Sequence, residues 1–366
     1  MAKDESKTLC TSNVLLYFFF TLFLLLITIC TFLTLHLFRP FVILNHLYFP
    51  NAITSYIYNV NCTDKDVDEA LFQRATSVTV AADDYCRKKK GMLNCDNKVA
   101  FMFMTKEKIP LLPLWERFFE GHKGKFSIYV HVPSEIYEEP QESSVFQGRR
   151  IPSKPVEWGK PSMVDAERRL LANALLDPLN QRFVLLSESC IPLYNFSIIY
   201  DYLIQSNLSF IGSFDDPKKS GRGRYNHKMS PTISLADWRK GSQWFEVHRE
   251  LANVIISDCR YYPLFVEYCQ PPCYMDEHYI PTLITKLHPS FNGNRSLTWT
   301  NWSKGGSHPA MFRRQDVSAQ LIEGIRRGKH CMYNGSNSSV CFLFARKFDA
   351  SSLEPLMHLL PVLLEY

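Results

Sequence analysis

Hydrophobic residues follow two different patterns along this chain. The first pattern is one unbroken apolar run, Val14 to Phe38, with no Asp, Glu, Lys or Arg in 25 residues. Because an α-helix rises 1.5 Å per residue, about 20 such residues cross the hydrocarbon core of a bilayer. A cleaved signal peptide is the alternative, but its apolar region is shorter, about 7–15 residues, and ends at small residues. The run predicts a retained transmembrane anchor at 14–38.

The second pattern begins at Lys98 and consists of short apolar segments that alternate between strand and helix character. Apolar runs predict strands at 98–105 and 182–188, and alternation predicts another strand at 126–132. Helical periodicity predicts a helix at 111–120. Ser162 and Asp165 have the spacing of a capping box, which predicts the start of another helix. This alternation predicts an α/β domain with a largely parallel sheet, whose ligands bind at the carboxyl ends of the strands.

These patterns divide the chain into five segments. We expect a tail at 1–13, the anchor at 14–38, a polar stem at 39–97, one globular domain at 98–350 and a C-terminal segment at 351–366. About 250 residues suffice for one sizeable core.

Glycosylation sequons indicate which side of the membrane the domain occupies, because the charges that flank the anchor are balanced. Asn-X-Ser/Thr occurs seven times, always C-terminal to the anchor: at Asn61, Asn195, Asn207, Asn294, Asn301, Asn334 and Asn337. Seven sequons on one side suggest a lumenal domain and a cytosolic N-terminal tail, which is the type II arrangement.

Cysteine content agrees with an oxidising lumen. Nine of the 11 cysteines follow the anchor, and an odd number leaves one unpaired. A zinc site is the alternative for Cys269 and Cys273, but no second pair with nearby histidines completes four ligands. The net charge of +5 is small for a chain of this length. The main basic cluster, 87–90, is interpreted as a solvated face of the stem, so no nucleic-acid partner is expected.

Several enzyme classes lack their usual signatures here. The sequence contains no Walker loop, no GxGxxG after the first strand, no GxSxG and no HExxH. The hydrolase and dinucleotide-binding hypotheses are therefore unsupported.

Six segments together resemble a known family. They are 183–196 (FVLLSESCIPLYNF), 213–225 (SFDDPKKSGRGRY), 240–252 (KGSQWFEVHRELA), 275–284 (MDEHYIPTLI), 297–309 (LTWTNWSKGGSHP) and 342–349 (FLFARKFD). They resemble glycosyltransferase family 14, and within it the plant branch of core-2/I-branching enzymes, over about 98–350. The resemblance implies a GT-A-type fold and an inverting, Golgi-resident, type II membrane enzyme. Its expected partners are a UDP-sugar donor and a glycan or glycoprotein acceptor, with no cofactor.

Inversion at a sugar carbon defines the residues to look for. An acceptor hydroxyl needs a carboxylate to take its proton as the new bond forms. The family pattern for this base is a Glu preceded by Asp at a helix start, which here implies Glu277 after Asp276. From the residues alone, the two carboxylates would only complement a helix N-terminus.

The leaving diphosphate needs positive charge, from a metal ion or from basic side chains. The resemblance implies that Lys347 supplies it in place of a metal, and that Arg346 either helps or points to solvent. From the residues alone, Lys347 would be an exposed lysine after a strand. The family has a second diphosphate-binding arginine, and this chain has Ser338 at that position. Arg346 or an arginine of the Arg326-Arg327 pair would have to substitute for the missing arginine. A family aspartate is replaced by Pro133. The Cys331–Cys341 loop is one residue longer than in the family, and a disulfide between these cysteines is expected to hold Lys347 in place.

Other candidate residues have open alternatives. Asp-X-Asp matches at 64–68 lie in the stem and are discounted as a metal site. The Asp215-Asp216 pair would bind a metal, contact acceptor hydroxyls, or open the turn at Pro217. Arg222 and Arg224 are candidates for binding the acceptor; the alternative is that they form a mobile basic loop. Trp299 and Trp302 are candidates for stacking on an acceptor sugar; the alternative is that they are buried core residues.

The sequence thus predicts an inverting, metal-independent transferase of GlcNAc, GlcA or a similar sugar. The alternative is a catalytically weak family member that binds carbohydrate or acts as a Golgi scaffold, which the replaced arginine and aspartate motivate. Pocket contacts rather than motifs choose the donor, acceptor and linkage.

Overall fold

The computed structural model describes residues 67–78, 96–134 and 137–364. The predicted anchor, 14–38, and the sequon at Asn61 lie outside these residues. Among the helices that are described, none has both the length and the apolar character needed to cross a bilayer.

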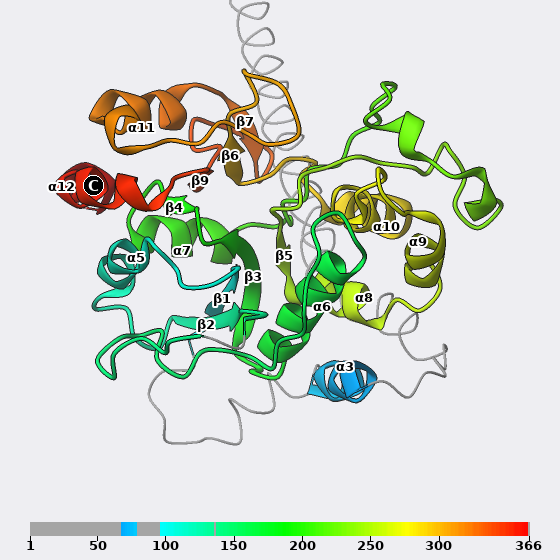
Figure 1. The fold of residues 1–366 in the computed structure, drawn as a ribbon, viewed down its shortest axis with the longest axis horizontal. Coiled ribbons are helices and arrows are strands. Elements are labelled where there is room, and N and C mark those ends of the chain that lie inside the picture. The colour runs from blue at the N-terminus through cyan, green and yellow to red at the C-terminus, as the bar shows by residue number, and fades with distance from the viewer. Residues whose placement is uncertain (1–66, 79–95, 135–136, 365–366) are drawn as a thin grey trace, which may run out of the picture. The chain divides into compact units, whose positions relative to one another are not determined.

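A four-stranded sheet forms the centre of the domain, in the order β2-β1-β3-β5 (Figure 1). Strands β1 (Lys98–Met104), β2 (Phe126–His131) and β3 (Asn180–Ser187) are parallel, and β5 (Glu246–His248) is antiparallel to β3. These three parallel strands confirm the predicted ones to within two residues. A mixed α/β fold with a mostly parallel sheet is therefore present.

Helices cover both faces of this sheet. Alternate residues of β1 (Val99, Phe101 and Phe103) belong to the same buried cluster as α5 (Leu112–Phe119) and α7 (Phe196–Ile204). On the other face, α6 (Ser162–Leu175) packs against the three parallel strands and against α8 (Arg249–Ser257). Burial on both faces explains why β1 reads as a continuous apolar run.

The capping box predicted at the start of α6 is wrong, although the helix begins where expected. The N-cap residue is Pro161, and the Ser162 hydroxyl accepts a hydrogen bond from the Glu157 backbone N–H at 2.9 Å instead. The Asp165 carboxylate accepts a hydrogen bond from the Tyr262 hydroxyl. A contact with Glu157, five residues earlier, and one with Tyr262, 97 residues later, therefore occupy the two side chains that the local pattern assigned to a cap.

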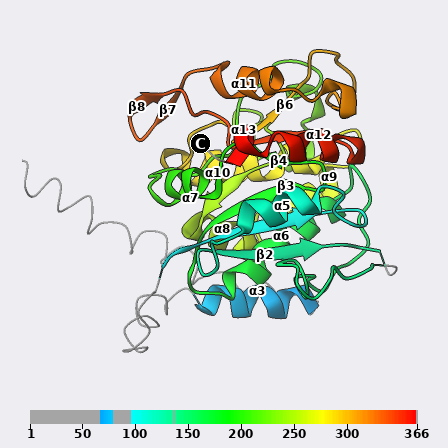
Figure 2. The same ribbon diagram turned by 90° about the vertical axis from the view of Figure 1, so that its left-hand side faces the viewer.

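A helix from the expected stem belongs to this domain. Helix α3 (Val67–Ser77) packs against α6 and α8 (Figure 2). The Asp68 carboxylate binds Arg169 of α6 through two hydrogen bonds, of 2.7 and 3.1 Å, and binds Lys154 at 2.8 Å. Asp68 is thus occupied in holding α3 to the domain.

A second, smaller sheet joins distant parts of the chain. It has the order β4-β9-β6, from β4 (Ile191–Pro192), β9 (Phe344–Arg346) and β6 (Thr298–Thr300), and β6 and β9 are parallel. Helices α12 (Leu353–His358) and α13 (Leu360–Leu364) follow β9, and their Leu356 and Leu363 are fully buried in the main core. The C-terminal segment is therefore part of the domain.

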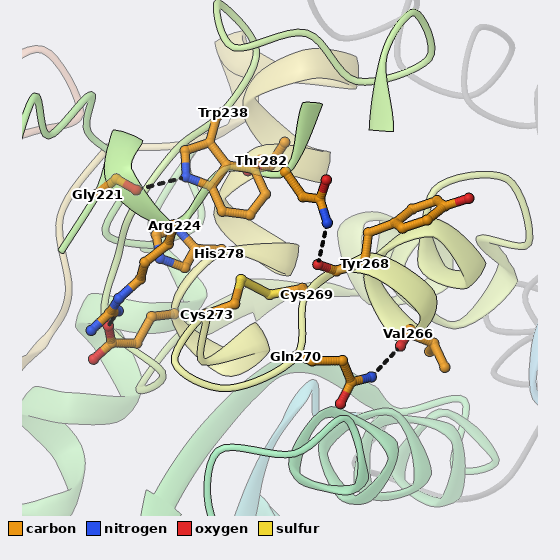
Figure 3. The surroundings of a disulfide bond; sticks show 12 residues. Gly221, Arg224, Trp238, Val266, Tyr268, Cys269, Gln270, Cys273, His278 and Thr282 are labelled. Carbon is orange, nitrogen blue, oxygen red and sulfur yellow. Dashed lines mark hydrogen bonds and ion pairs between the residues drawn. A yellow bond between two sulfur atoms is a disulfide. The ribbon is translucent and has the colours of Figure 1, made fainter. Parts of the chain in front are cut away.

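Two disulfides whose cysteines are both among the described residues close short loops. Cys331 is bonded to Cys341 beside the hairpin of β7 (Cys331–Tyr333) and β8 (Ser336–Ser338), which is the pair the sequence analysis expects. Cys269 is bonded to Cys273 at the end of α9 (Tyr262–Tyr268), ahead of α10 (Tyr279–Leu287) (Figure 3). Cys190 is buried and free. Helix α11 (Ala319–Arg327) precedes the hairpin.

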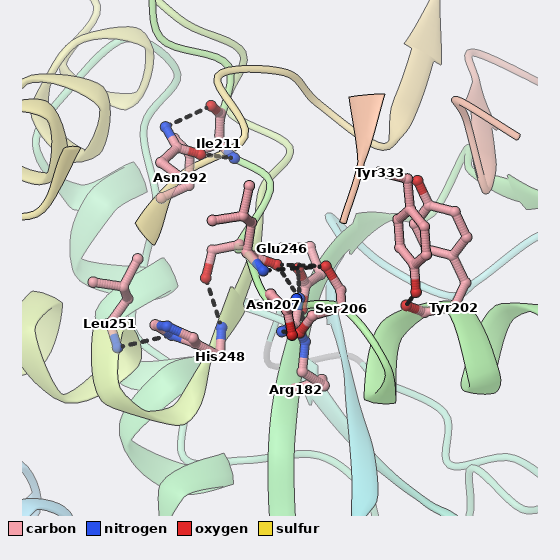
Figure 4. A network of polar contacts seen from close by, with 12 residues as sticks. Arg182, Tyr202, Ser206, Asn207, Ile211, Glu246, His248, Leu251, Asn292 and Tyr333 are labelled. Atoms are coloured by element: carbon pink, nitrogen blue, oxygen red, sulfur yellow. Dashed lines mark hydrogen bonds and ion pairs between the residues drawn. The ribbon is translucent and has the colours of Figure 1, made fainter. Parts of the chain in front are cut away.

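A buried ion pair fastens β5 to β3 (Figure 4). The Arg182 guanidinium binds both carboxylate oxygens of Glu246, at 2.6 and 2.7 Å, and donates to the Leu208 backbone carbonyl at 2.8 Å. Such bidentate pairs fix geometry as well as contribute energy. Because removing one partner would leave a buried charge, the pair sets the position of β5 and of the segment before it.

Candidate active site

Glu277 lies in a short 3-10 helix, Met275–Glu277, directly before α10. Its backbone carbonyl accepts a hydrogen bond from the Gly241 N–H at 2.8 Å. A Cβ on Gly241 would lie 1.8 Å from the Gly212 carbonyl oxygen, so only glycine allows this close approach. The 240–241 segment is thereby held beside Glu277.

Two cations bind the Glu277 carboxylate. Oε2 accepts hydrogen bonds from Arg224 Nη1 and from Lys240 Nζ, each at 2.5 Å. Burial acts to raise the pKa of Glu277, but the two cations outweigh it and hold the pKa below its usual value. Within the described residues, no hydrogen bond occupies Oε1. Glu277 is therefore an ionised carboxylate with one oxygen available.

Stacked rings position the arginine that contacts Glu277. The His278 ring stacks on Trp238 with centroids 4.5 Å apart, and Trp238 donates a hydrogen bond to the Gly221 carbonyl at 3.1 Å (Figure 3). His278 Nδ1 lies 2.8 Å from the Arg239 carbonyl, and burial lowers the pKa of His278 to about 4. A neutral histidine thus links the Arg224 loop to the segment that carries Lys240.

Two more acidic residues, Asp276 and Glu167, are buried near Glu277. Burial and the neighbouring Glu277 charge raise the pKa of Asp276 to about 6, and its Oδ1 has no hydrogen-bond partner among the described residues. Burial, with a contribution from Asp276, also raises the pKa of Glu167, whose Oε1 accepts a hydrogen bond from Gln243 at 2.9 Å. The Asp276 carboxyl therefore titrates only slightly below neutral pH.

This shift predicts a pH-dependent cost to stability. Because the folded-state pKa of Asp276 lies above the unfolded value of 3.8, folding binds a proton between about pH 4 and 6, and stability falls as pH rises through that window. Asp276→Asn should therefore unfold at a higher denaturant concentration than wild type at pH 7, with a gain of about 3 kcal/mol that shrinks toward pH 4.

Urea unfolding at pH 4 and pH 7 checks this prediction. Asp201→Asn is the matched control, because Asp201 is exposed on α7. A difference between Asp276→Asn and wild type that is the same at both pH values would contradict it.

Lys347 and Arg346 lie at the end of β9, which brings them near the carboxyl ends of β1 and β3. Glu188, just after β3, and Lys106, just after β1, both act on the pKa of Lys347. Burial, followed by the charge of Arg346, lowers the pKa of the half-buried Lys347. The guanidinium of Arg346 lies 4.1 Å from the Trp244 ring centroid, and Arg346 Nε has no hydrogen-bond partner among the described residues. Two adjacent cations therefore share this edge of the sheet.

One short segment connects the two charged groups. Lys240 contacts Glu277, and Trp244, four residues later, stacks under Arg346. Four residues span at most about 14 Å of extended chain, so one short stretch of backbone links the residue on the carboxylate to the residue on the cation pair. Phe312 lies beside the cation pair, because its backbone N–H donates a hydrogen bond to the Lys347 carbonyl at 2.7 Å.

The remaining candidates have mixed positions. Arg222 pairs with Asp215 on the surface at 2.5 Å, whereas only Arg224 reaches Glu277. Asp216 holds a turn, because its carboxylate accepts hydrogen bonds from the Lys218 N–H at 3.0 Å and the Ser220 hydroxyl at 2.8 Å. Trp299 is half-buried, with its ring 5.8 Å from that of Phe312, and Trp302 is exposed.

The arginines of α11 do not substitute for the family arginine. Arg326 is buried, and its guanidinium donates to the Leu193 carbonyl at 2.6 Å and to the Val362 carbonyl at 2.9 Å. Arg327 is exposed and pairs with Glu323 at 2.8 Å. Ser338 lies in β8, where its hydroxyl accepts a hydrogen bond from the Val340 N–H. Of the substitutes considered, Arg346 alone lies beside Lys347.

The sequons differ in their access to solvent. Asn207, Asn294, Asn334 and Asn337 are exposed, and Asn195 and Asn301 are half-buried. Asn195 caps α7, because its Oδ1 accepts the Ile198 N–H at 2.9 Å. Asn334 Nδ2, the atom that a glycan would modify, donates to the Gln205 carbonyl at 2.8 Å.

Three features of the site escaped the sequence analysis. They are Lys240 on the Glu277 carboxylate, Glu167 behind Asp276, and an aromatic contact between Trp158 and Tyr274, whose ring centroids are 4.8 Å apart. Each joins residues far apart in sequence. A signal existed only for Lys240, which opens one of the family-like segments. Within the described residues, no three His, Cys, Asp or Glu side chains converge on a point where they could hold a metal ion.

The fold belongs to the class of α/β proteins with a mostly parallel sheet, in which ligands bind at the carboxyl ends of the strands, and Lys347 and Arg346 lie near that edge. Comparison with known proteins gives the particular class. The family model of the Core-2/I-branching enzyme matches residues 99–326. A rice (Oryza sativa subsp. japonica) protein named Glycosyltransferase BC10 is 36% identical over 302 residues, covering 70% of this chain and 74% of that protein. The chain belongs to the core-2/I-branching family of glycosyltransferases.

Proposed function

We propose that this chain is an inverting glycosyltransferase that moves a sugar, such as GlcNAc or GlcA, from a UDP-sugar to a glycan or glycoprotein. The observation that carries the proposal is an ionised carboxylate, Glu277, which the 240–244 segment links to two adjacent cations, Lys347 and Arg346. Displacement at the anomeric carbon needs a base on the acceptor side and positive charge on the diphosphate side. These three residues supply both.

In this scheme, Glu277 Oε1 takes the proton of the acceptor hydroxyl while the hydroxyl oxygen attacks the anomeric carbon. The bond to the UDP oxygen breaks, and Lys347 and Arg346 stabilise the negative charge that develops on the diphosphate. Arg224 and Lys240 hold Oε2 and keep the carboxylate ionised before each turnover. The low pKa makes Glu277 a weak base, so its contribution depends on exact placement against the acceptor.

Several finer features belong to the same proposal. Membership of the family supports a GT-A-type fold, and the predicted anchor at 14–38 with seven sequons beyond it supports a type II Golgi protein with a lumenal domain. The diphosphate is proposed to be bound by Lys347 and Arg346 without a metal ion or any other cofactor.

A donor screen with and without chelator tests the proposal. We expect the purified domain, residues 62–366, to transfer sugar from UDP-GlcNAc, UDP-GlcA, UDP-xylose or UDP-galactose to glycan acceptors, with activity unchanged in EDTA. Activity abolished by EDTA and restored by Mn²⁺ would contradict the metal-free scheme. Glycan binding without transfer from any donor would favour the carbohydrate-binding or scaffolding alternative.

A further inference from the structure

Trp158 is a large aromatic residue on the surface near the candidate base. It is 54% exposed, although tryptophans are usually largely buried. Its ring centroid lies 4.8 Å from that of Tyr274 and 5.2 Å from that of His308. Three rings from distant parts of the chain therefore meet around an exposed indole.

This ring cluster contacts the site through Arg224. The Arg224 guanidinium lies 4.6 Å from the Tyr274 ring centroid, and the same guanidinium binds Glu277. Tyr274 also directly precedes the 3-10 helix that carries Glu277. Trp158 is thus linked through Tyr274 and Arg224 to the proposed base.

The backbone is shaped to bring Trp158 and Tyr274 together. Tyr274 has a φ of 59°, a left-handed conformation that costs a bulky residue roughly 1–2 kcal/mol. Gly159, with a φ of 77°, follows Trp158, and a Cβ there would lie 3.0 Å from the Tyr274 ring. A glycine and a tyrosine in left-handed conformations thus flank this contact, and the indole stays largely exposed.

We propose that Trp158 forms a second acceptor subsite, where its indole stacks on a pyranose ring next to the sugar that receives the transferred residue. The inference rests on the proposed function, because the base must face the acceptor. Sugar rings present flat C–H surfaces that pack on aromatic faces. The preferred acceptor is accordingly an oligosaccharide rather than a monosaccharide.

Binding to a glycan array tests this subsite. The array carries β-galactan, xylan, mannan and mucin-type O-glycan fragments of one to four residues, and it is probed with wild type, Trp158→Ala and Trp158→Phe. We expect wild type to bind at least one oligosaccharide series about tenfold more tightly than its monosaccharide, from one aromatic stacking contact plus buried area. Trp158→Ala should lose this length dependence, and Trp158→Phe should retain most of it.

Two controls separate the possible failures. Met332→Ala removes another exposed apolar side chain, on β7, and should leave the length dependence unchanged. If Trp158 only braces Tyr274, Trp158→Ala will lower the unfolding temperature but keep the length dependence, which overturns the subsite. Absence of length dependence in wild type overturns it as well. UDP binding is measured in parallel. If wild type does not bind UDP, the proposed function is refuted. If wild type binds UDP but shows no length dependence, only the subsite is refuted.

Discussion

Glu277→Gln should lower turnover at least about 100-fold while the affinity for UDP changes little. General-base catalysis typically contributes about 10²–10⁴-fold, and glutamine keeps the size of the side chain but cannot take a proton. Because the loss occurs in the transition state, kcat and kcat/KM should fall together. Steady-state kinetics and calorimetric UDP titration measure the two quantities.

The structure suggests how to separate catalysis from folding in this experiment. Glutamine leaves Arg224 and Lys240 without their anion, so the unfolding temperature of Glu277→Gln must be compared with that of wild type. Glu142→Gln makes the same chemical change on the exposed surface and should keep full activity. A folded Glu277→Gln protein with more than a tenth of wild-type turnover would remove Glu277 as the base.

The elements that the sequence predicts well are those with a continuous local signal. Strands β1 and β3 are mostly apolar and buried on both faces of the sheet, so their composition marks them, and the alternation of polar and apolar residues marks β2. Helix α3 gave no such signal, because an ion pair between Asp68 and Arg169, 101 residues apart, contributes to its attachment. The capping box failed for the same reason: Tyr262, 97 residues away, takes the Asp165 carboxylate.

The residues of the candidate site also divide into those with a local or family signal and those without one. Glu277, Lys347 and Arg346 stand in contiguous segments that resemble the family, so the resemblance reaches them. Lys240 acts on Glu277 from 37 residues away, and no spacing rule links the two. Asp216, by contrast, had a local explanation as a turn residue, and its carboxylate makes those turn contacts. Local chemistry and family pattern are readable in one sequence, but partners brought together by the fold are not.

Lys347→Ala should weaken both UDP binding and turnover, which distinguishes it from Glu277→Gln. A hydrogen bond to a charged group contributes about 1.5–3 kcal/mol, so the Kd for UDP should rise roughly 10- to 100-fold. The diphosphate is charged in the ground state and gains charge as the bond breaks, so kcat/KM should fall about 10²–10³-fold. Uridine, which has no phosphate, should bind wild type and variant equally.

The pH dependence of UDP binding gives a second readout of Lys347. Burial and Arg346 lower the pKa of Lys347 below its usual value, so the ammonium is lost earlier as pH rises. UDP affinity should therefore weaken on the alkaline side in wild type, and Lys347→Arg, which stays charged, should remove that weakening. Lys123→Ala, at an exposed lysine, is the matched control and should change neither quantity. If uridine loses as much affinity as UDP in Lys347→Ala, the lysine acts on the nucleoside or on the fold rather than on the diphosphate.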